Sequence, residues 1–385
     1  MKKKRICILG STGSIGRNTL NVISGLSDRF QVVGLCAQSN VSLLAEQANK
    51  FRPKAVAIGD ETKIGELNKK LKEKVRVFVG KQGIEELARQ EEADIVLIAI
   101  SGSASIRPTY TAVASGKDIA LASKEALVSA GHIITREAKR RDSAIIPVDS
   151  EHSALFQCLM AGHTSEVARL YITASGGPAW AMPKSAFRNL SKETVLKHPK
   201  WKMGKKISVD SATMMNKGLE VIEAKWLFGI DIDDIKILIH PEAIVHSMVE
   251  FVDGSVLAQL GITDMQLPIQ YALSYPKRYK SELKQLDLIK IRRLTFYKPD
   301  VNKFPSLKLA YEAAREGGSA TAVLNSSNEA AVRAFLHNKI KFTDIPIIIE
   351  KLLSHHKRIE FPTLSEIEAI EEWVKSEVER FCYLS

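Results

Sequence analysis

Three carboxylates in two short polar runs are the residues of this chain best suited to bind a metal ion. Asp149 and Glu151 lie in the run PVDSEH at residues 147–152, and Glu220 ends the run SATMMNKGLE at residues 211–220. Carboxylate oxygens suit hard divalent cations such as Mg2+ and Mn2+. Residues two apart in an extended chain point the same way, so Asp149 and Glu151 are expected to face one ion. A lone acid pair is more often a solvated turn, so the prediction depends on the combination with Glu220.

The second run also carries groups that suit a phosphate. Asn216 and Lys217 precede Glu220 by four and three residues, so the three side chains share one helix face. Ser211 and Thr213 come just before that helix, where donors near an N-terminus favour an anion. Lys217 and Glu220 alone would indicate a surface ion pair. With the hydroxyls and the amide they predict a site for a phosphorylated substrate.

Two further segments offer polar groups next to predicted strands. The run TASGGP at residues 173–178 places Ser175 on a glycine turn that suits a phosphate. The run SKE at residues 123–125 follows a strand and would place a cation and an acid at the ligand-binding edge of the sheet. Each has a structural alternative, which is a simple turn for the first and a helix cap with a surface lysine for the second.

Residues 197–206 form a basic, glycine-containing stretch with one large aromatic residue, Trp201. A lid that closes over a bound anion has this composition. An exposed loop has it too, except that Trp201 would be costly to leave exposed. His198 lies in the stretch and is suited to contact a phosphate, although a lone histidine is more often structural.

A glycine loop, GSTGSIG at residues 10–16, follows an apolar run and precedes a helical stretch at residues 17–23. Glycines let the backbone approach a pyrophosphate, and the helix N-terminus favours its charge. The spacing is G-x-x-G-x-x-G, so outside this strand-loop-helix context the loop would equally indicate an ordinary tight turn. An NAD site usually has an acid at the end of the second strand, whereas this chain has Ser39 and Asn40, which favours NADP.

These groups need a scaffold, and the first 150 residues alternate apolar runs with helical stretches. Unalternating apolar runs are typical of strands buried on both faces, so the pattern predicts a doubly wound, Rossmann-like parallel sheet. The helical stretches include residues 41–51 and 84–91. The predicted strands are residues 5–9, 31–37, 55–58, 75–79, 94–100, 118–122 and 144–148.

The rest of the chain predicts two more domains after an NADPH-binding domain at residues 1–150. Residues 151–275 combine glycine turns, a long helix and an extended run at 245–260, which indicates an α+β catalytic domain with a lid at about 197–206. A basic linker is expected at 276–305 and a small helical domain at 306–385. Helix starts are expected just after residues 325–328 and at the capping-box run 363–366.

Composition narrows the class of protein. The chain has 385 residues, 45% hydrophobic and 26% charged, which suits two or three folded domains. Its net charge of +11 suits anionic substrates. The sequence has no single basic stripe with interleaved aromatic residues, so nucleic-acid binding is not expected. Cys7, Cys36, Cys158 and Cys382 form no C-x-x-C pair, which argues against disulfides and zinc. The first apolar run is too short for a signal peptide or membrane span, so a soluble cytoplasmic protein without a membrane partner is expected.

These motifs together make the chain resemble the 1-deoxy-D-xylulose-5-phosphate reductoisomerase family almost from end to end. The most specific pieces are VDSEH at 148–152, TASGGP at 173–178, HPKWKM at 198–203 and MNKGLE at 215–220. The resemblance implies conversion of 1-deoxy-D-xylulose 5-phosphate to 2-C-methyl-D-erythritol 4-phosphate in non-mevalonate isoprenoid biosynthesis. It implies a metal-assisted skeletal rearrangement, then hydride transfer from NADPH, in a homodimer with a helical C-terminal domain.

The same resemblance implies roles for individual residues. The expected ligands of Mg2+ or Mn2+ are Asp149, Glu151 and Glu220, with Lys124 as a further catalytic residue. The expected substrate contacts are Lys124, Ser150, Glu151, Ser175, His198, Ser211, Asn216, Lys217 and Glu220. The expected NADPH contacts are Thr12, Gly13, Ser14, Ile15, Gln38, Ser39, Asn40, Ser123, Glu125 and Gly204. Trp201 and Met203 would belong to the lid.

The chain departs from the family pattern near the expected cofactor. The family commonly has Gly-Lys-Asn where Gln38, Ser39 and Asn40 stand, and Asn where Ser123 stands. Loss of that lysine leaves the strength of the preference for NADPH over NADH open. Two alternatives also remain, a dehydrogenase of the aspartate-semialdehyde or homoserine type and a non-catalytic anion-binding or nucleic-acid-binding protein. The dehydrogenase has no reason to combine three carboxylates with a Lys-Trp-Met lid.

Overall fold

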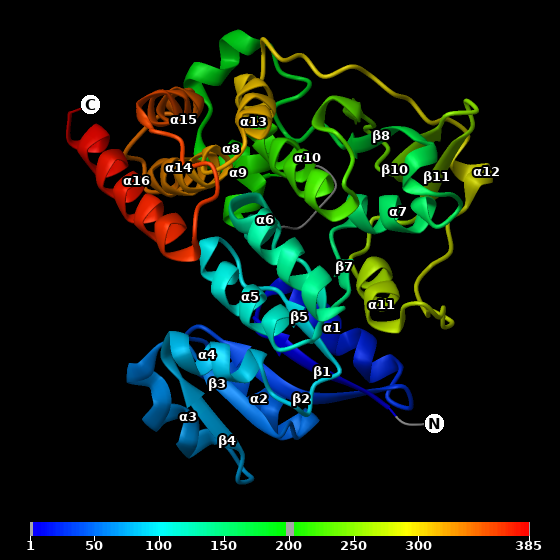
Figure 1. Cartoon of the computed structure of the whole chain (residues 1–385), viewed down its shortest axis with the longest axis vertical. Helices are drawn as coiled ribbons and strands as arrows, with labels where there is room; N and C mark the ends of the chain where they lie inside the picture. Colours follow the sequence, from blue (N-terminus) through cyan, green and yellow to red (C-terminus); the bar gives the residue numbers. More distant parts are fainter. Residues whose placement is uncertain (1–2, 198–203, 385) are drawn as a thin grey trace. The chain divides into compact units, whose positions relative to one another are not determined.

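The structure is a computed structural model that describes residues 3–197 and 204–384, and it divides into two compact units (Figure 1). Unit 1 comprises Met1–Ala126, Ile133–Ser153 and Asp264–Leu283, and unit 2 comprises Leu127–His132, Ala154–Thr263 and Lys284–Ser385. The division passes through two helices, α6 (Lys124–Arg141) and α7 (Ser150–Leu159). The finer division into four segments that the sequence suggests stays a prediction.

Unit 1 is built on a seven-stranded parallel sheet with the order β4-β3-β2-β1-β5-β6-β7. The strands are β1 (Lys4–Leu9), β2 (Phe30–Ala37), β3 (Ala55–Ile58), β4 (Arg76–Val79), β5 (Ile95–Ile98), β6 (Asp118–Leu121) and β7 (Ile145–Pro147). Each overlaps a predicted strand, so the doubly wound parallel sheet is confirmed. The strand order reverses between β1 and β5, and open sheets bind ligands at the carboxyl ends of strands beside such a point.

Helices cover this sheet. They are α1 (Ser14–Gly25), α2 (Val41–Phe51), α3 (Ile64–Lys70), α4 (Gly80–Ala88), α5 (Ile106–Ala114), α11 (Gln266–Ser274) and the two ends of α6. The amphipathic helices α4 and α5 pack against each other, and α11 packs against α1, β6 and β7. Residues 264–274 therefore belong to the core of unit 1, although more than 100 residues separate them from β7.

Unit 2 joins a four-stranded sheet to a helical bundle (Figure 1). The sheet has the order β11-β10-β8-β9, with β8 (Val167–Ala174) parallel to β9 (Ile235–Ile239), and with β10 (Val245–Phe251) antiparallel to β8 and to β11 (Val256–Leu260). The predicted extended run at 245–260 is therefore the hairpin β10–β11. The helices are α8 (Lys192–Val195), α9 (Lys205–Thr213), α10 (Met215–Phe228), α12 (Leu288–Ile291), α13 (Pro305–Glu316), α14 (Ala320–Leu336), α15 (Asp344–His355) and α16 (Leu364–Leu384).

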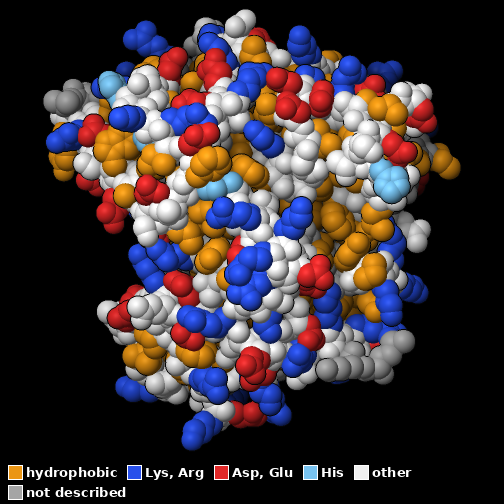
Figure 2. Space-filling view, viewed as in Figure 1, with side chains coloured by type: hydrophobic (Ala, Val, Ile, Leu, Met, Phe, Trp, Pro, Cys, Tyr) orange, Lys and Arg blue, Asp and Glu red, His pale blue; other side chains and the backbone are white. Residues whose placement is uncertain are grey.

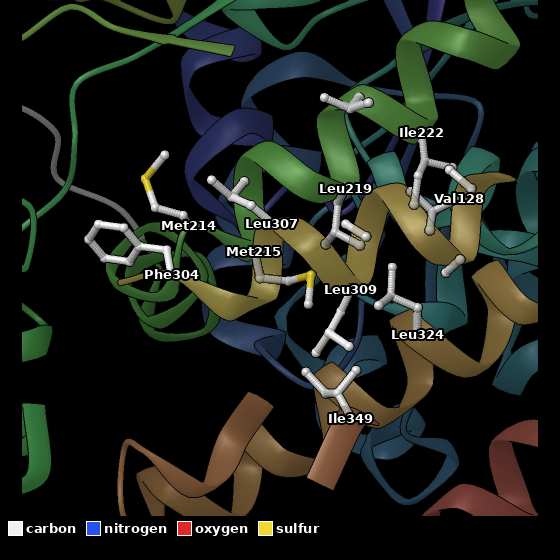
Figure 3. Packing of buried hydrophobic residues seen from close by; sticks show 14 of the residues in the cluster. Val128, Met214, Met215, Leu219, Ile222, Phe304, Leu307, Leu309, Leu324 and Ile349 are labelled. Carbon is white, nitrogen blue, oxygen red and sulfur yellow. The ribbon is translucent and has the colours of Figure 1, made fainter. Parts of the chain in front are cut away.

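The core of unit 2 holds α10 rigidly. This helix contacts strands β8 and β9 and also helix α13. Its Leu219 and Ile222 are fully buried in one apolar cluster with Leu307 of α13 and Leu324 of α14, as Figure 3 shows. The polar residues at the start of α10 are therefore carried by an element that packing fixes along its length.

Of the two predicted helix starts, one is confirmed and one is wrong. At α16 the Thr363 N–H donates to the Glu366 carboxylate at 2.7 Å and the Glu366 N–H donates to the Thr363 hydroxyl at 3.2 Å, which is a capping box. At residues 325–328, in contrast, α14 has already begun at Ala320. These polar residues lie inside the helix because Asn325 and Asn328 bond to other helices instead of capping their own.

The cysteines behave as small core residues in the described chain. All four are free thiols, and Cys7 and Cys36 are buried in β1 and β2. Burial raises the pKa of the Cys36 thiol to about 12 and raises that of Cys7 as well. Neither thiol is therefore a ready nucleophile or metal ligand.

The visible surface mixes the two signs of charge. Figure 2 shows Lys and Arg side chains interspersed with Asp and Glu on this face. Within the described residues, none of the helices has the length and apolar character that crossing a bilayer requires. The cytoplasmic location expected from the sequence remains a prediction.

Candidate active site

The glycine loop after β1 is shaped by close backbone contacts. Gly10 has a φ of +93°, and a Cβ there would lie 2.4 Å from the carbonyl oxygen of Ala99. A Cβ on Gly16 would lie 2.4 Å from the carbonyl oxygen of Gly10. The Gly10 N–H also donates to the Cys36 carbonyl in β2 at 3.1 Å. The loop is thus fixed between strands, and it leads into α1 at Ser14, where first-turn N–H groups favour an anion.

The expected cofactor residues of unit 1 occupy two neighbouring strand ends. Residues 12–15 form the loop and the first turn of α1, at the end of β1. Gln38, Ser39 and Asn40 are exposed at the end of β2. The Asn40 side chain caps α2 by accepting the Leu43 N–H at 3.2 Å. The exposed residues that follow β2 therefore offer amide and hydroxyl groups, and the adjoining glycine loop is bonded to the end of this strand.

Lys124 and Asp149 meet at the carboxyl ends of β6 and β7. Lys124 is the first residue of α6, and Asp149 directly precedes α7. The Lys124 Nζ lies 2.5 Å from the Asp149 Oδ2, and the two side chains are only 8% and 18% exposed. A charge-assisted bond at such a site is strong because little water screens it. Lys124 thus lies at this edge of the sheet, but the carboxylate that it binds is Asp149, and the roles expected for Lys124 and Glu125 stay predictions.

The expected extended chain through Asp149 and Glu151 is wrong. Helix α7 begins at Ser150, so Glu151 lies in its first turn, and the Asp149 carbonyl accepts the Ser153 N–H at 2.8 Å. Ser150 links the two acids, because its N–H donates to Asp149 Oδ1 at 3.0 Å and its hydroxyl donates to Glu151 Oε2 at 2.6 Å. The helix start, and not strand alternation, brings these acids together.

Asn216, Lys217 and Glu220 converge at the start of α10, as their spacing predicts. The Asn216 Nδ2 donates to Glu220 Oε1 at 2.5 Å, and the Lys217 Nζ donates to Glu220 Oε2 at 2.6 Å. Glu220 is 0% exposed and Lys217 is 7% exposed, so the pair is not a surface ion pair. A buried carboxylate is tolerated only when both oxygens have donors or a cation, and here each oxygen has a donor.

Two hydroxyl-bearing segments meet next to α10. Ser211 lies in the last turn of α9, three residues before Met214, which turns the chain with a left-handed φ of +62°. Gly177 has a φ of +67°, and a Cβ there would lie 2.6 Å from the Ser211 carbonyl oxygen and 2.9 Å from its hydroxyl. The glycine turn that carries Ser175 therefore packs directly on Ser211.

Several expected residues have other tasks or lie elsewhere. The Thr213 hydroxyl accepts the Met215 N–H at 3.3 Å, so it serves the junction between α9 and α10. The Ser123 hydroxyl donates to the Ile100 carbonyl. Glu125 is buried at the start of α6, and Gly204 is exposed just before α9. His198, Trp201 and Met203 lie outside the described residues.

Two residues that shape the site, Gly177 and Met214, were not predicted from the sequence. Gly177 had a signal, because paired glycines in TASGGP allow a left-handed turn and a close approach. Met214 had none, since methionine does not usually adopt a positive φ and only the packing of unit 2 reveals it.

Comparison with known proteins gives one consistent result. A family model described as 1-deoxy-D-xylulose 5-phosphate reductoisomerase matches residues 6–131, and models of its C-terminal domains match residues 145–228 and 260–377. The 1-deoxy-D-xylulose 5-phosphate reductoisomerase of Caldanaerobacter subterraneus is 52% identical over 369 residues, which are 96% of each chain. That of Chloroherpeton thalassium is 51% identical over 92% of each chain.

Solved structures of the same enzyme are similar over nearly the whole chain. The Zymomonas mobilis enzyme in complex with NADPH has a TM-score of 0.93 and 40% identity, with 99% of both chains covered. A DOX-P reductoisomerase in complex with NADPH, fosmidomycin and magnesium has a TM-score of 0.94 and 40% identity, with 99% of this chain and 98% of that chain covered. The matched residues cover 99% of this chain, so both units have counterparts in these structures.

Proposed function

The chain belongs to the 1-deoxy-D-xylulose 5-phosphate reductoisomerase family, and we propose that Asp149, Glu151 and Glu220 together bind its divalent cation. Its activity is the NADPH-dependent conversion of 1-deoxy-D-xylulose 5-phosphate to 2-C-methyl-D-erythritol 4-phosphate. The metal assignment is supported by one observation: Asp149, Glu151 and Glu220 form a group of side chains that could hold a metal ion, each offering one carboxylate oxygen. Mg2+ and Mn2+ both prefer such oxygen ligands, and a relative was solved in complex with magnesium.

The chemistry of each acid fits this role. Asp149 is held by Lys124, and Glu220 is held by Lys217 and Asn216, so the carboxylates are oriented before any ion binds. Positioned ligands bind a cation better than mobile ones because less conformational entropy is lost. When bound, the cation supplies Lewis-acid stabilisation of substrate oxygens during the rearrangement.

The remaining groups of the site bind and orient the substrate. We assign the phosphate to Ser175, Ser211, Asn216 and Lys217, because their hydroxyl, amide and ammonium groups lie on two adjoining segments and one helix start. Lys124 and Ser150 contact the substrate backbone, and His198 contacts the substrate from the proposed lid at about residues 197–206, which also carries Trp201 and Met203. Phosphate contacts are remote from the reacting bonds, but they contribute binding energy that positions the substrate for the transition state.

NADPH is assigned to the strand ends of unit 1. The pyrophosphate would lie on residues 12–15, where the loop and the start of α1 offer backbone N–H groups. Gln38, Ser39 and Asn40 would face the 2′-phosphate as neutral donors, and Ser123, Glu125 and Gly204 complete the proposed set. Because no lysine stands at position 39, the ratio of kcat/KM for NADPH to that for NADH is the quantity that measures this preference.

The assay of NADPH oxidation tests the function directly. With 1-deoxy-D-xylulose 5-phosphate and Mg2+, the protein is expected to oxidise NADPH. A chelator should abolish the reaction, and added Mg2+ or Mn2+ should restore it. A dehydrogenase of the homoserine or aspartate-semialdehyde type would have no such metal requirement. Oxidation that continues in excess chelator would contradict the metal-dependent function.

The contact between Gly177 and Ser211 gives a prediction about the phosphate. In Gly177→Ala the new Cβ would clash with Ser211 and the left-handed backbone would be strained. We expect KM for the phosphorylated substrate to rise by about ten-fold or more, as the loss of one hydrogen bond to a charged group would give, with a smaller change in kcat.

Gly254→Ala is the matched control for this variant. Gly254 also has a positive φ, of +86°, but a Cβ there would meet nothing within 4 Å. It lies in the turn between β10 and β11, so it shares the backbone strain without the clash. An unchanged KM in a folded Gly177→Ala enzyme would remove this loop and Ser211 from the phosphate site.

The proposed homodimer would use the exposed hairpin of unit 2. Strand β11 is an edge strand, and Val252, Val256 and Leu257 of the hairpin are 70%, 49% and 40% exposed. Natural proteins seldom leave an apolar edge strand uncovered. The double variant Val256→Lys with Leu257→Glu is expected to halve the mass measured by light scattering, whereas Ile289→Glu on α12 should not. An unchanged mass in the double variant would contradict this interface.

A further inference from the structure

Helix α14 carries four consecutive polar residues, residues 325–328, inside the apolar core of unit 2. Asn325, Ser327 and Asn328 are 0% exposed. Buried polar side chains lower stability unless they are hydrogen-bonded, and among the described protein atoms neither the Oδ1 atoms of Asn325 and Asn328 nor the hydroxyls of the two serines between them have a hydrogen-bond partner. Apolar residues would pack here at lower cost, so a role other than stability is indicated.

The two asparagines of this run bond to different helices. The Asn325 Nδ2 donates to the hydroxyl of Ser129 in α6 at 3.1 Å, whereas the Asn328 Nδ2 donates to the Oδ1 of Asp210 in α9 at 2.8 Å. They are three residues apart, so they share one face of α14. The bond to Asp210 is charge-assisted and therefore stronger than the neutral bond to Ser129.

Asp210 holds α9 in place through contacts of both of its carboxylate oxygens. Its carboxylate is 2% exposed, and its Oδ2 lies 2.8 Å from the Nζ of Lys206, one turn earlier in the same helix. Helix α9 has nine residues and ends at the left-handed Met214, so it is too short to be stable without tertiary contacts. Because Asp210 directly precedes Ser211, the contact that fixes Asp210 also fixes the position of Ser211.

We propose that Asn328 is a positioning residue for the phosphate site, which acts through Asp210 to set where α9 presents Ser211. The inference rests on the proposed function, in which Ser211 binds the substrate phosphate. Asn328 itself touches no substrate. The helical bundle thus contributes to substrate binding through one buried hydrogen bond between α14 and α9.

The test is Asn328→Ala in the full-length enzyme with NADPH and Mg2+. The KM for 1-deoxy-D-xylulose 5-phosphate should rise about ten-fold, and the inhibition constant of inorganic phosphate should rise by a similar factor, which corresponds to one weakened charge-assisted contact. The kcat and the KM for NADPH should stay unchanged. A purely structural role would lower the melting temperature without this division between KM and kcat.

Asn325→Ala is the matched control, because it lies on the same helix, is equally buried and also loses one hydrogen bond. It should lower the melting temperature while both phosphate-linked constants stay unchanged. Asn328→Asp should raise KM by placing a second carboxylate beside Asp210. Adding Asp210→Asn should recover most of the loss, because an amide again donates to a carboxylate.

Three outcomes would overturn the inference in an active wild-type enzyme. They are unchanged constants in Asn328→Ala, equal increases in Asn325→Ala, and no recovery in the double variant. If Asn328→Ala does not fold, Asn328→Leu, which nearly keeps the side-chain volume but donates no hydrogen bond to Asp210, is measured in its place, with unchanged constants again overturning the inference. A wild-type protein that shows no substrate-dependent NADPH oxidation would refute the proposed function instead.

Discussion

Glu220→Gln is expected to lower kcat/KM by about a thousand-fold, roughly 4 kcal/mol of transition-state stabilisation, while the protein stays folded. Glutamine keeps the size of the side chain, and its one amide oxygen can accept from either Asn216 or Lys217. It lacks the negative charge, however, and a neutral amide is a weaker ligand for Mg2+ than a carboxylate. The loss should be accompanied by a higher Mg2+ concentration for half-maximal activity, measured by titration in the coupled assay.

The control for this variant lies on the same helix. Glu223→Gln removes another buried carboxylate of α10, one turn further on, which with Asp149 and His152 makes up a second set of possible metal ligands, so the variant tests which donor set binds the ion. We expect it to keep a wild-type dependence on Mg2+. Near-normal turnover of Glu220→Gln at ordinary Mg2+ concentrations would reject the metal assignment, and the more so if Glu223→Gln were inactive.

Lys217→Ala is expected to have the second-largest effect on kcat/KM. In contrast to Glu220→Gln, it should impair substrate binding and not the metal site. The variant removes the ammonium that we assign to the substrate phosphate but keeps all three carboxylates. We expect KM for the phosphorylated substrate to rise about a hundred-fold, which corresponds to a lost charged hydrogen bond of roughly 3 kcal/mol. The requirement for Mg2+ should remain, because Glu220 keeps its charge and its hydrogen bond from Asn216.

Lys225→Ala separates this effect from a general loss of lysine on α10. The Lys225 Nζ donates to the Ala314 carbonyl of α13 at 3.1 Å, so it serves the packing of the bundle. Its variant is expected to lose some thermal stability and to keep KM. If kcat/KM of Lys217→Ala equalled that of the wild type, the phosphate role of Lys217 would be excluded.

Local sequence patterns predicted the parts of the fold that depend on local chemistry. Strands such as β3 and β5 are unbroken apolar runs because both of their faces are buried, which a parallel sheet requires. The face that joins Asn216 and Lys217 to Glu220 follows from helix periodicity alone. The capping box at Thr363 is likewise local, since both partners lie within three residues.

The features that could not be predicted from the sequence depend on contacts between residues far apart in the chain. Helix α11 joins unit 1 through contacts with α1, β6 and β7, and no residue within α11 signals such distant partners. Asn325 and Asn328 have the composition of a helix cap, but Ser129 and Asp210 take their hydrogen bonds, and only the tertiary structure brings those groups close. Strand periodicity failed at Asp149 because the chain turns into a helix one residue later.

The central claim is that one divalent cation is bound by carboxylates far apart in the sequence. Anomalous diffraction from crystals of the enzyme grown with Mn2+ and NADPH measures this most directly. We predict a single Mn2+ peak within bonding distance of carboxylate oxygens of Asp149, Glu151 and Glu220. A peak coordinated without Glu220, or no peak beside Asp149 and Glu151 at a Mn2+ concentration that supports full activity, would contradict the account.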